Sequence, residues 1–411
     1  MKKHIQLSKL LVTRQLLEDP IMIKLQRFLS DDMHIPYAQE ECIAHLIAAG
    51  EQLGLSGNLL SHYLIYALTH TPNIVSETID RTGMFPGDSL YNAFCHDISL
   101  LYPLLSEPSS TFLSAAFLDD YLPTKIIYNK VQDSFMDQLK AVKSSKAYAK
   151  ELLAFYMRYG YGDLATYAAF RWNDDKNNIC GIQHFEQIQM NDLIGYERQK
   201  EQIIQNTLAF VSDKPANHVL LVGARGTGKS SAVKALISMF EDSRLRLLQI
   251  TKRQLQKLPD IMDMLRHHIN RKFIIFLDDL SFEDSDAAFK EVKSAIEGGV
   301  SSCPPNVCIY ATSNRRHLVR ETWHDREQDE LYHDDSANET ISLSDRFGLI
   351  IHYHTPNQSE YLAIIDHLLR QNGIELTPEE LHIAGLRWEM THSGRSGRTA
   401  KQFAAHYLGN H

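Results

Sequence analysis

The spacing of apolar and polar residues differs between the two halves of the chain. Up to about residue 172, apolar residues recur at three- and four-residue spacing, most clearly in 41–50, 59–68 and 147–159. This spacing is typical of amphipathic helices. From residue 192 onward, helical patterns alternate with short apolar runs. The runs are 219–222, 245–250, 273–277 and 307–310. That alternation predicts a parallel sheet flanked by helices.

Composition narrows the class of protein without identifying its chemistry. Hydrophobic residues make up 44% of the 411 positions and charged residues 23%, as in globular proteins. The net charge of -9 gives no general affinity for nucleic acid or for an anionic membrane. No stretch approaches the ~20 apolar residues of a membrane span, and no apolar signal-peptide region follows the basic N-terminus. We therefore expect a cytoplasmic protein without a membrane partner.

The cysteines indicate neither a disulfide framework nor a zinc site. They are five in number, scattered along the chain, and include no Cys-x-x-Cys pair. An odd, scattered set is typical of reduced thiols in a reducing compartment.

The clearest chemical signal is the run Gly223-Ala224-Arg225-Gly226-Thr227-Gly228-Lys229-Ser230, which matches G-x-x-x-x-G-K-[ST]. The glycines allow a tight loop whose backbone N–H groups point at a phosphate. A predicted strand precedes the run and a predicted helix follows it, which favours a P-loop over a purely structural turn. In a P-loop, Lys229 contacts the β- and γ-phosphates and the Ser230 hydroxyl coordinates Mg²⁺. With Ser231 added, this run is the predicted site for ATP and Mg²⁺.

A second run supports the first. The apolar residues 273–277 end in Asp278 and Asp279, which is the Walker B arrangement. Asp278 would hold Mg²⁺ through its water shell, and Asp279 would orient or deprotonate the attacking water. A strand that merely reaches solvent would give the same pattern, but its position downstream of a P-loop favours the catalytic interpretation.

Residues 192–411 resemble the AAA+ ATPases in several segments that occur in the family's order. Leu193-Ile194-Gly195-Tyr196-Glu197 is similar to the segment that lines the adenine pocket, which implies nucleotide contacts for Ile194 and Gly195. The run 307–313 ends at Asn314, where the family places the polar residue called sensor 1. The resemblance implies that Asn314 positions the hydrolytic water, the alternative being a simple turn residue.

The same resemblance singles out two arginines. The segment 342–348 is similar to the arginine-finger segment, which implies that Arg346 reaches the site of a neighbouring subunit. The segment 393–399 is similar to a sensor 2 motif, with Arg398 the first choice and Arg395 the second. Cationic donors around the γ-phosphate favour phosphoryl transfer. The resemblance therefore implies an ATPase that forms a homo-oligomer with ATP. The alternative for either arginine is a structural ion pair.

One position departs from the family pattern. Most AAA+ ATPases carry Glu as the second Walker B carboxylate, and this chain carries Asp279, which is one methylene shorter. Glu283 is the nearest acid that could assist. We therefore expect slow or partner-stimulated turnover, or use of the site as an ATP-dependent switch. A narrower resemblance is carried by five segments, which are Phe170-Arg171-Trp172, 195–200, 278–283, 311–318 and 343–348. Together they resemble a bacterial AAA+ family catalogued only as a domain of unknown function.

These patterns predict an α/β protein with a three-layer αβα P-loop core of the AAA+ type. We place a mainly helical N-terminal domain at 1–172, a polar linker at 173–190, the nucleotide-binding core at 191–354 and a helical lid at 355–411. The dense aromatic group between 155 and 172 is interpreted as helical core. His96 and Asp97 beside Cys95 suggest a metal or nucleophile site only weakly, because no further ligand lies at useful spacing.

The client of the ATPase stays open among three hypotheses. The chain could remodel or load a protein complex, act on nucleic acid like a helicase loader, or serve as a nucleotide-gated scaffold with little turnover. The nucleic-acid hypothesis depends on a basic stretch, which a solvated helix face paired to Asp260 and Asp263 would also explain. Its members are Lys252, Arg253, Lys257, Arg266, His267, His268, Arg271 and Lys272. The acidic segment 324–335 is interpreted as a solvated loop, with a role in gating assembly as the alternative.

Overall fold

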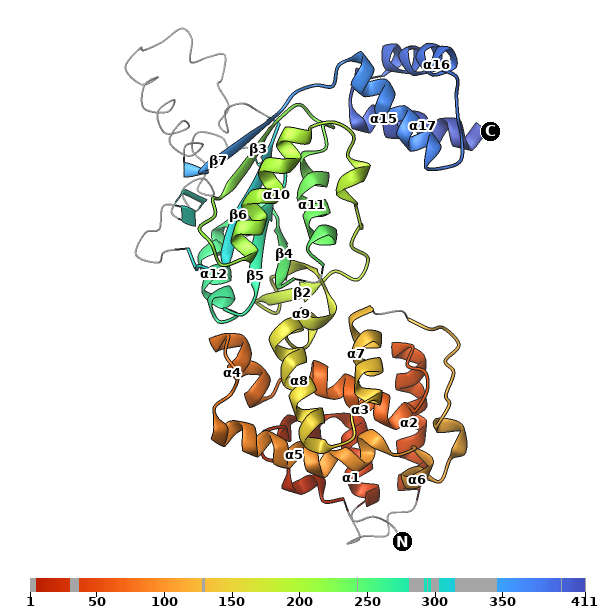
Figure 1. Cartoon of the computed structure of the whole chain (residues 1–411), viewed down its shortest axis with the longest axis vertical. Helices are drawn as coiled ribbons and strands as arrows, with labels where there is room; N and C mark the ends of the chain where they lie inside the picture. Colours follow the sequence, from red (N-terminus) through yellow and green to blue (C-terminus); the bar gives the residue numbers. More distant parts are fainter. Residues whose placement is uncertain are drawn as a thin grey trace. The chain divides into compact units, whose positions relative to one another are not determined.

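The computed structural model describes residues 5–29, 37–127, 130–241, 243–280, 292–293, 295–296, 303–314, 346–392 and 394–410. The chain forms two compact units (Figure 1). The first contains Met1–Tyr167 together with His267–Arg271, and the second contains Ala168–Arg266 and Lys272–His411. The chain therefore crosses between the units three times. Glu283 and the segment 324–335 lie outside the described residues.

The first unit is helical. Its α-helices are α1 (Pro20–Leu29), α2 (Ala38–Leu53), α3 (Leu59–His70), α4 (Ile74–Thr82), α5 (Asp88–Ser106), α6 (Ser110–Leu113), α7 (Lys130–Lys140), α8 (Ser145–Tyr159) and α9 (Asp163–Thr166), with short 3-10 turns at Leu7–Lys9, Arg14–Glu18 and Ala116–Leu118. One apolar core joins them, with Leu46, Leu64, Phe94 and Tyr156 completely buried. Burial of such a core is the main stabilising term for a bundle of this kind.

Asp97 anchors the N-terminal segment to α5. Its carboxylate is fully buried and accepts hydrogen bonds from the backbone N–H groups of Leu11, Val12 and Thr13 at 2.8–3.0 Å. These bonds satisfy a buried charge that would otherwise be costly. Within the described residues no cluster of three or more His, Cys, Asp or Glu side chains could hold a metal. The hydrogen bonds of Asp97 give it a structural role, because they hold the N-terminal segment on α5.

The second unit is built on a seven-stranded sheet with the order β2-β1-β4-β5-β6-β3-β7. Its strands are β1 (Ala169–Asn173), β2 (Asn178–Gly181), β3 (Val219–Gly223), β4 (Leu245–Ile250), β5 (Lys272–Leu277), β6 (Val307–Ser313) and β7 (Leu349–Tyr353). Among the strand pairs of this sheet that the structure describes, only β1–β2 is antiparallel. Strands β3, β5 and β6 are buried along nearly their whole length, as expected when both faces of a parallel sheet are covered.

Helices cover both faces of this sheet. On one face, α10 (Glu197–Val211) and α11 (Lys229–Met239) contribute Ile203, Val233 and Leu236 to a shared core with the strands. The amphipathic helix α12 (Leu258–Arg266) packs on β6 and buries Ile261 and Leu265. The predicted three-layer αβα architecture is confirmed. Further 3-10 turns lie at Met190–Asp192 and Lys252–Lys257.

The predicted end of the first domain and the predicted linker differ from the structure. Residues 169–172 belong to the sheet as β1, because Phe170 and Trp172 are buried and β1 pairs in parallel with β4. The polar run after β1 is a hairpin turn, in which the Asn173 side chain accepts the N–H groups of Asp175 and Lys176. A polar turn between two short strands has the composition of a linker. The aromatic group between 155 and 172 is accordingly divided between the two units.

After β7 the chain forms three helices, α15 (Gln358–Arg370), α16 (Pro378–Thr391) and α17 (Gly397–Asn410). They share a small core that includes Tyr361, Ile365 and Phe403. Asn357 and Thr377 begin α15 and α16 with capping boxes, which satisfy the first backbone N–H groups of each helix. In the part of the chain that the structure describes, no helix is both long and apolar enough to cross a bilayer.

The basic stretch between Lys252 and Lys272 is not one exposed surface. Arg271 is fully buried, and Lys272 is nearly so. Lys272 forms an ion pair with Asp213 at 2.8 Å, and Arg266 lies 3.8 Å from Asp263. The interpretation of this stretch as a phosphate-binding surface is therefore wrong for its C-terminal end, because its last two cations are used inside the fold.

Candidate nucleotide-binding site

The P-loop connects β3 to α11 at the carboxyl end of the sheet, where the ends of parallel strands commonly form a site. Gly223 has a φ of +147°, and a Cβ there would lie 1.9 Å from the Tyr353 carbonyl oxygen. Gly226 and Gly228 also have positive φ, at +75° and +89°. Only glycine adopts such backbone readily. The loop geometry therefore depends on these glycines.

Lys229 is the first residue of α11, directly after the loop, and has little exposure to solvent. Its Nζ donates to the carbonyl oxygens of Gly223 and Ala224 at 2.8 Å each and to Asn314 Oδ1 at 3.1 Å. Burial lowers the pKa of Lys229 to about 8, an effect that the carboxylates of Asp279 and Asp278 oppose. A partly desolvated ammonium next to a positive helix N-terminus is suited to bind an anion.

The Walker B carboxylate lies next to the P-loop hydroxyl. Ser230 Oγ donates to Asp278 Oδ1 at 2.6 Å, and Thr312 Oγ1 donates to the same oxygen at 2.7 Å. Mg²⁺ prefers oxygen ligands, usually one or two from the protein with the rest from water and phosphate. The hydroxyl and carboxylate fit that ion. Thr312 in β6 was not predicted, since nothing in an apolar strand marks one threonine as a partner of Asp278.

Asp279 and Asn314 form the neighbouring pair. Asn314 Nδ2 donates to Asp279 Oδ1, and the Asp279 backbone N–H donates to Thr312 Oγ1 at 2.9 Å. Asp279 has a φ of +55°, a left-handed conformation that is uncommon outside glycine but tolerated by Asp and Asn. The hydrogen bond to Thr312 supports this backbone turn. The two side chains predicted to act on water are thus in direct contact.

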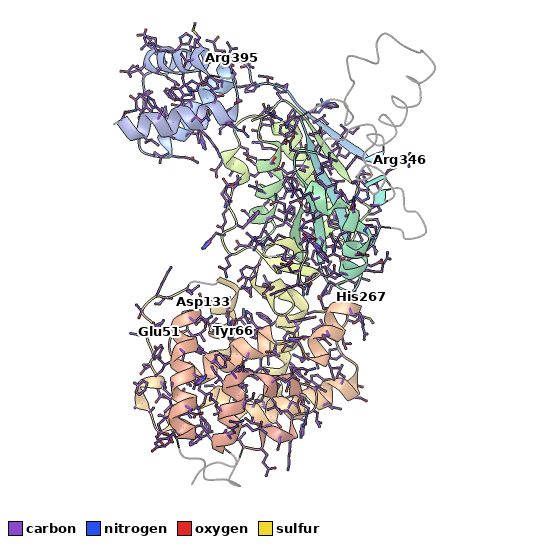
Figure 2. All side chains as sticks on the ribbon, turned by 180° about the vertical axis from the view of Figure 1, so that it is seen from behind. Glu51, Tyr66, Asp133, His267, Arg346 and Arg395 are labelled. Atoms are coloured by element: carbon purple, nitrogen blue, oxygen red, sulfur yellow. The ribbon has the colours of Figure 1, made fainter. Side chains whose placement is uncertain are left out.

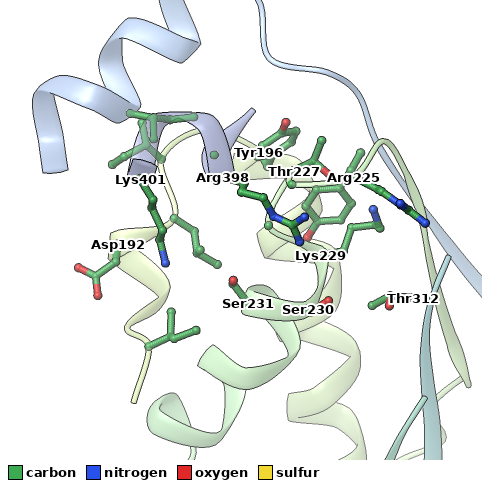
Figure 3. Close-up of a pocket in the computed structure, with 18 of the residues that line it drawn as sticks. Asp192, Tyr196, Arg225, Thr227, Lys229, Ser230, Ser231, Thr312, Arg398 and Lys401 are labelled. Atoms are coloured by element: carbon green, nitrogen blue, oxygen red, sulfur yellow. The ribbon is translucent and has the colours of Figure 1, made fainter. Parts of the chain in front are cut away.

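The N-terminus of α17 is seated on the P-loop. The Gly397 N–H donates to the Gly226 carbonyl oxygen at 2.8 Å, and Ser396 Oγ caps the helix by accepting from the Thr399 N–H at 3.1 Å. This contact brings Arg398 and, one turn later, Lys401 to the cavity (Figure 3). Arg395 instead pairs with Glu389 at 2.9 Å and is not among the lining residues. The geometry thus favours Arg398 over Arg395. Lys401 was not predicted.

These groups line one cavity of about 930 Å³, which falls within the usual size range of small-molecule sites. Its apolar part includes Ile194, Tyr196 and Tyr353, with the two tyrosine rings 4.9 Å apart. Tyr196 OH donates to the His354 carbonyl oxygen at 2.6 Å, which fixes the ring. Burial is the main reason that the pKa of Tyr196 is raised to about 12.

Most of the predicted site residues converge on this cavity. The lining includes Ile194, Arg225, Gly226, Thr227, Gly228, Lys229, Ser230, Ser231, Asp278, Asp279, Asn314 and Arg398. Gly195, Gly223 and Ala224 lie beside lining residues without lining the cavity themselves. Arg346 is exposed just before β7 and does not line it either (Figure 2). A role for Arg346 in a neighbouring subunit stays a prediction.

Comparison with known proteins identifies a family for this chain. No curated protein matches the sequence. Among solved structures, the Thermotoga maritima RuvB Holliday junction branch migration motor is 16% identical with a TM-score of 0.36, covering 53% of this chain and 63% of that chain. The FIGL-1 AAA domain in complex with ADP is 17% identical with a TM-score of 0.37, covering 54% of this chain and 73% of that chain. The matched region thus spans less than two thirds of the RuvB chain.

The family model described as "Protein of unknown function (DUF815)" matches residues 165–411. That span contains the sheet, the P-loop and the three C-terminal helices described above. Because it covers more than half of the sequence, the chain belongs to the DUF815 family.

Proposed function

We propose that this chain binds ATP with Mg²⁺, hydrolyses it slowly, and uses the cycle to remodel or load a macromolecular partner. The observation that carries the proposal is the convergence of three pairs on one cavity. Lys229 contacts Asn314, Ser230 contacts Asp278, and Asn314 contacts Asp279. These side chains come from the P-loop and from the ends of β5 and β6, and they form a continuous polar network next to the cavity.

The network supports binding through charge. Lys229, Arg225 and Arg398 line the phosphate-loop side of the cavity, where a polyphosphate would find cationic donors and loop N–H groups. Ser230 and Asp278 would hold Mg²⁺, which neutralises charge that develops on the phosphoryl oxygens. The apolar side near Ile194 and Tyr353 is suited to a base.

The network also supports a hydrolytic role. Asp279 would accept a proton from the attacking water or orient that water, and Asn314 would hold the Asp279 carboxylate in place. Because Asp is shorter than Glu, the water has to approach closer to the strand end, so we expect low turnover. Arg346 would complete the site of an adjacent copy, which makes a homo-oligomer with ATP part of the proposal.

A nucleotide-gated scaffold is the second candidate. The contact between Asn314 and Asp279 favours it, because a carboxylate oxygen that is engaged by an amide donor is less available to orient or deprotonate a water molecule. In that case the chain would bind ATP, change its interactions with a partner and release little phosphate. No observation on the described residues favours a nucleic-acid client.

The test combines mass photometry with phosphate release, each with and without ATP–Mg²⁺. Lys229→Ala is compared with Lys234→Ala, a change on the same helix at a lysine that pairs with Glu186. We expect assembly and slow release in the unmodified protein and in Lys234→Ala, and neither in Lys229→Ala. ATP binding without release would favour the scaffold. A protein that binds no ATP at all would contradict both candidates.

A further inference from the structure

The segment His267–Arg271 belongs to the helical unit although its neighbours on both sides do not. It connects α12 to β5, and its first residue is labelled in Figure 2. An ordinary connection in an α/β unit is a short surface loop. This connection instead forms hydrogen bonds with the C-terminal ends of α4 and α8 in the first unit.

Arg271 caps the end of α8. Its guanidinium is fully buried and donates to the carbonyl oxygens of Arg158 at 2.5 Å, Tyr156 at 2.8 Å and Met157 at 3.2 Å. The last carbonyls of a helix have no partner within the helix, and a cation is favourable there. Arg271 Nε also donates to Asp80 Oδ1 at 3.3 Å, so a buried carboxylate balances the charge.

The rest of the segment binds the end of α4. The Asn270 backbone N–H donates to the Asp80 carbonyl oxygen at 3.0 Å, and the His268 ring contacts the Asp80 carboxylate. Asn270 Nδ2 reaches across to the Met157 carbonyl oxygen at 2.8 Å. The segment therefore satisfies the final turns of α4 and α8 at once, and neither end is complete without it.

The same segment leads directly into the strand of the nucleotide site. Arg271 is followed by β5, which is buried along its whole length and ends immediately before Asp278. Close-packed strands transmit displacement rather than absorb it. A shift at the Asp278 end of β5 would be passed along the strand to Lys272, which is joined to Arg271 by a single peptide bond.

We propose that His267–Arg271 is a coupling segment, through which the nucleotide state of the P-loop site changes the ends of α4 and α8 in the helical unit. Arg271 is its positioning residue. The inference rests on the proposed nucleotide binding, and it adds a route by which that binding is sensed outside the nucleotide-binding unit. A partner held by the helical unit would respond to ATP by this route.

Hydrogen exchange of the full chain, with and without saturating ATP–Mg²⁺, tests the coupling directly. We expect exchange in the last turns of α4 and α8 to change at least about three-fold on nucleotide addition, as local openings respond to altered contacts. Amides of α2, a helix that packs on α1 and α3, should not change. Binding is verified in parallel with a fluorescent ATP analogue, and Lys229→Ala should abolish both signals.

Three variants separate coupling from stability. In Arg271→Met the nucleotide response of α4 and α8 should fall by at least about three-fold while analogue affinity stays within about two-fold. Arg271→Lys should restore part of the response, and Arg266→Met, at an exposed cation of α12, should leave it unchanged. A purely structural arginine would lower the melting temperature and keep the response.

Two results would overturn the coupling. One is bound nucleotide with no change in the ends of α4 and α8 of the unmodified protein. The other is a full response in Arg271→Met. Failure of the analogue to bind the unmodified protein would instead count against the proposed function itself, so the two failures are distinguishable.

Discussion

Charged side chains in the two units are satisfied in different ways. In the helical unit, Asp97 and Arg271 are fully buried and are bonded mainly to backbone groups from distant parts of the chain. At the cavity of the second unit, Asp278 and Asp279 are held by the side chains of Ser230, Thr312 and Asn314. Lys229 is held by Asn314 and by two carbonyl oxygens of the adjacent P-loop. The first set has fixed partners, whereas the second set borders open space.

This difference distinguishes buried charges that stabilise the fold from charges at the cavity that are available to bind a ligand. A buried charge tied to backbone cannot exchange partners without local unfolding, because its loss leaves several groups unsatisfied. A charge at the edge of a cavity can exchange its nearby partners for a phosphate or Mg²⁺ when that ligand arrives. The comparison can be broken or sharpened by experiments on one residue of each kind.

The largest effect is expected at the exposed Arg346, which extends the second kind because it is predicted to meet the phosphates of a neighbouring subunit's site. Arg346→Ala should reduce phosphate release by about 1000-fold, or about 4 kcal/mol in the activation barrier, because an arginine finger neutralises charge in the transition state. ATP binding should stay unchanged. Steady-state release at saturating ATP measures the loss, with Arg370→Ala, an exposed ion-paired arginine of α15, as the control. Equal loss of ATP binding would make Arg346 structural.

The next effect concerns a charge with fixed partners. Asp97→Ala should lower the free energy of unfolding by about 3 kcal/mol, since three backbone N–H groups and the Thr13 hydroxyl lose a buried acceptor. Urea denaturation followed by circular dichroism measures it. Asp137→Ala removes a mostly exposed carboxylate paired with Lys140 and should change stability by less than about 0.5 kcal/mol. Similar losses in both would contradict the distinction.

The smallest effect concerns pH. Burial lowers the pKa of Lys229 to about 8, and bound phosphates would raise it again, so ATP binding takes up a proton at and above pH 8. Between pH 7 and 9 the affinity should fall by about tenfold, or about 1.4 kcal/mol. Titration calorimetry in buffers of different ionisation enthalpy detects the proton uptake.

Lys229→Arg is the control for the pH effect, because a guanidinium stays protonated over this range. Its affinity should be lower than that of the unmodified protein and nearly independent of pH. A pH dependence that persists in Lys229→Arg would assign the proton to another group.

The site residues that could be predicted from the sequence are those that lie within a few positions of a recognisable apolar run. The P-loop, the two Walker B carboxylates and Asn314 each follow an apolar run, and the carboxyl ends of parallel strands meet at one edge of the sheet. Their convergence could therefore be expected before any coordinates. Arg398 was identified with Arg395 as its alternative, and the choice required the contact of Gly397 with Gly226.

The contacts that could not be predicted join residues that are far apart in the sequence. Thr312 lies 34 residues from Asp278, and Asp97 lies 84 residues from Thr13. No local pattern marks such pairs. The segment from Asn173 to Gly181 has the composition of a linker because a hairpin turn and a linker use the same residues. Arg271 looked like part of a basic surface because charge alone does not reveal burial.

The insertion of His267–Arg271 also has a consequence for biosynthesis. A chain leaves the ribosome from its N-terminus, and domains generally fold in that order. Here α4 and α8 emerge early, but the residues that finish their last turns emerge only after β3, the P-loop, β4 and α12. The helical unit therefore gains these last hydrogen bonds late in synthesis. A chain truncated before Arg271 would leave the ends of α4 and α8 without them and exposed to chaperones and proteases.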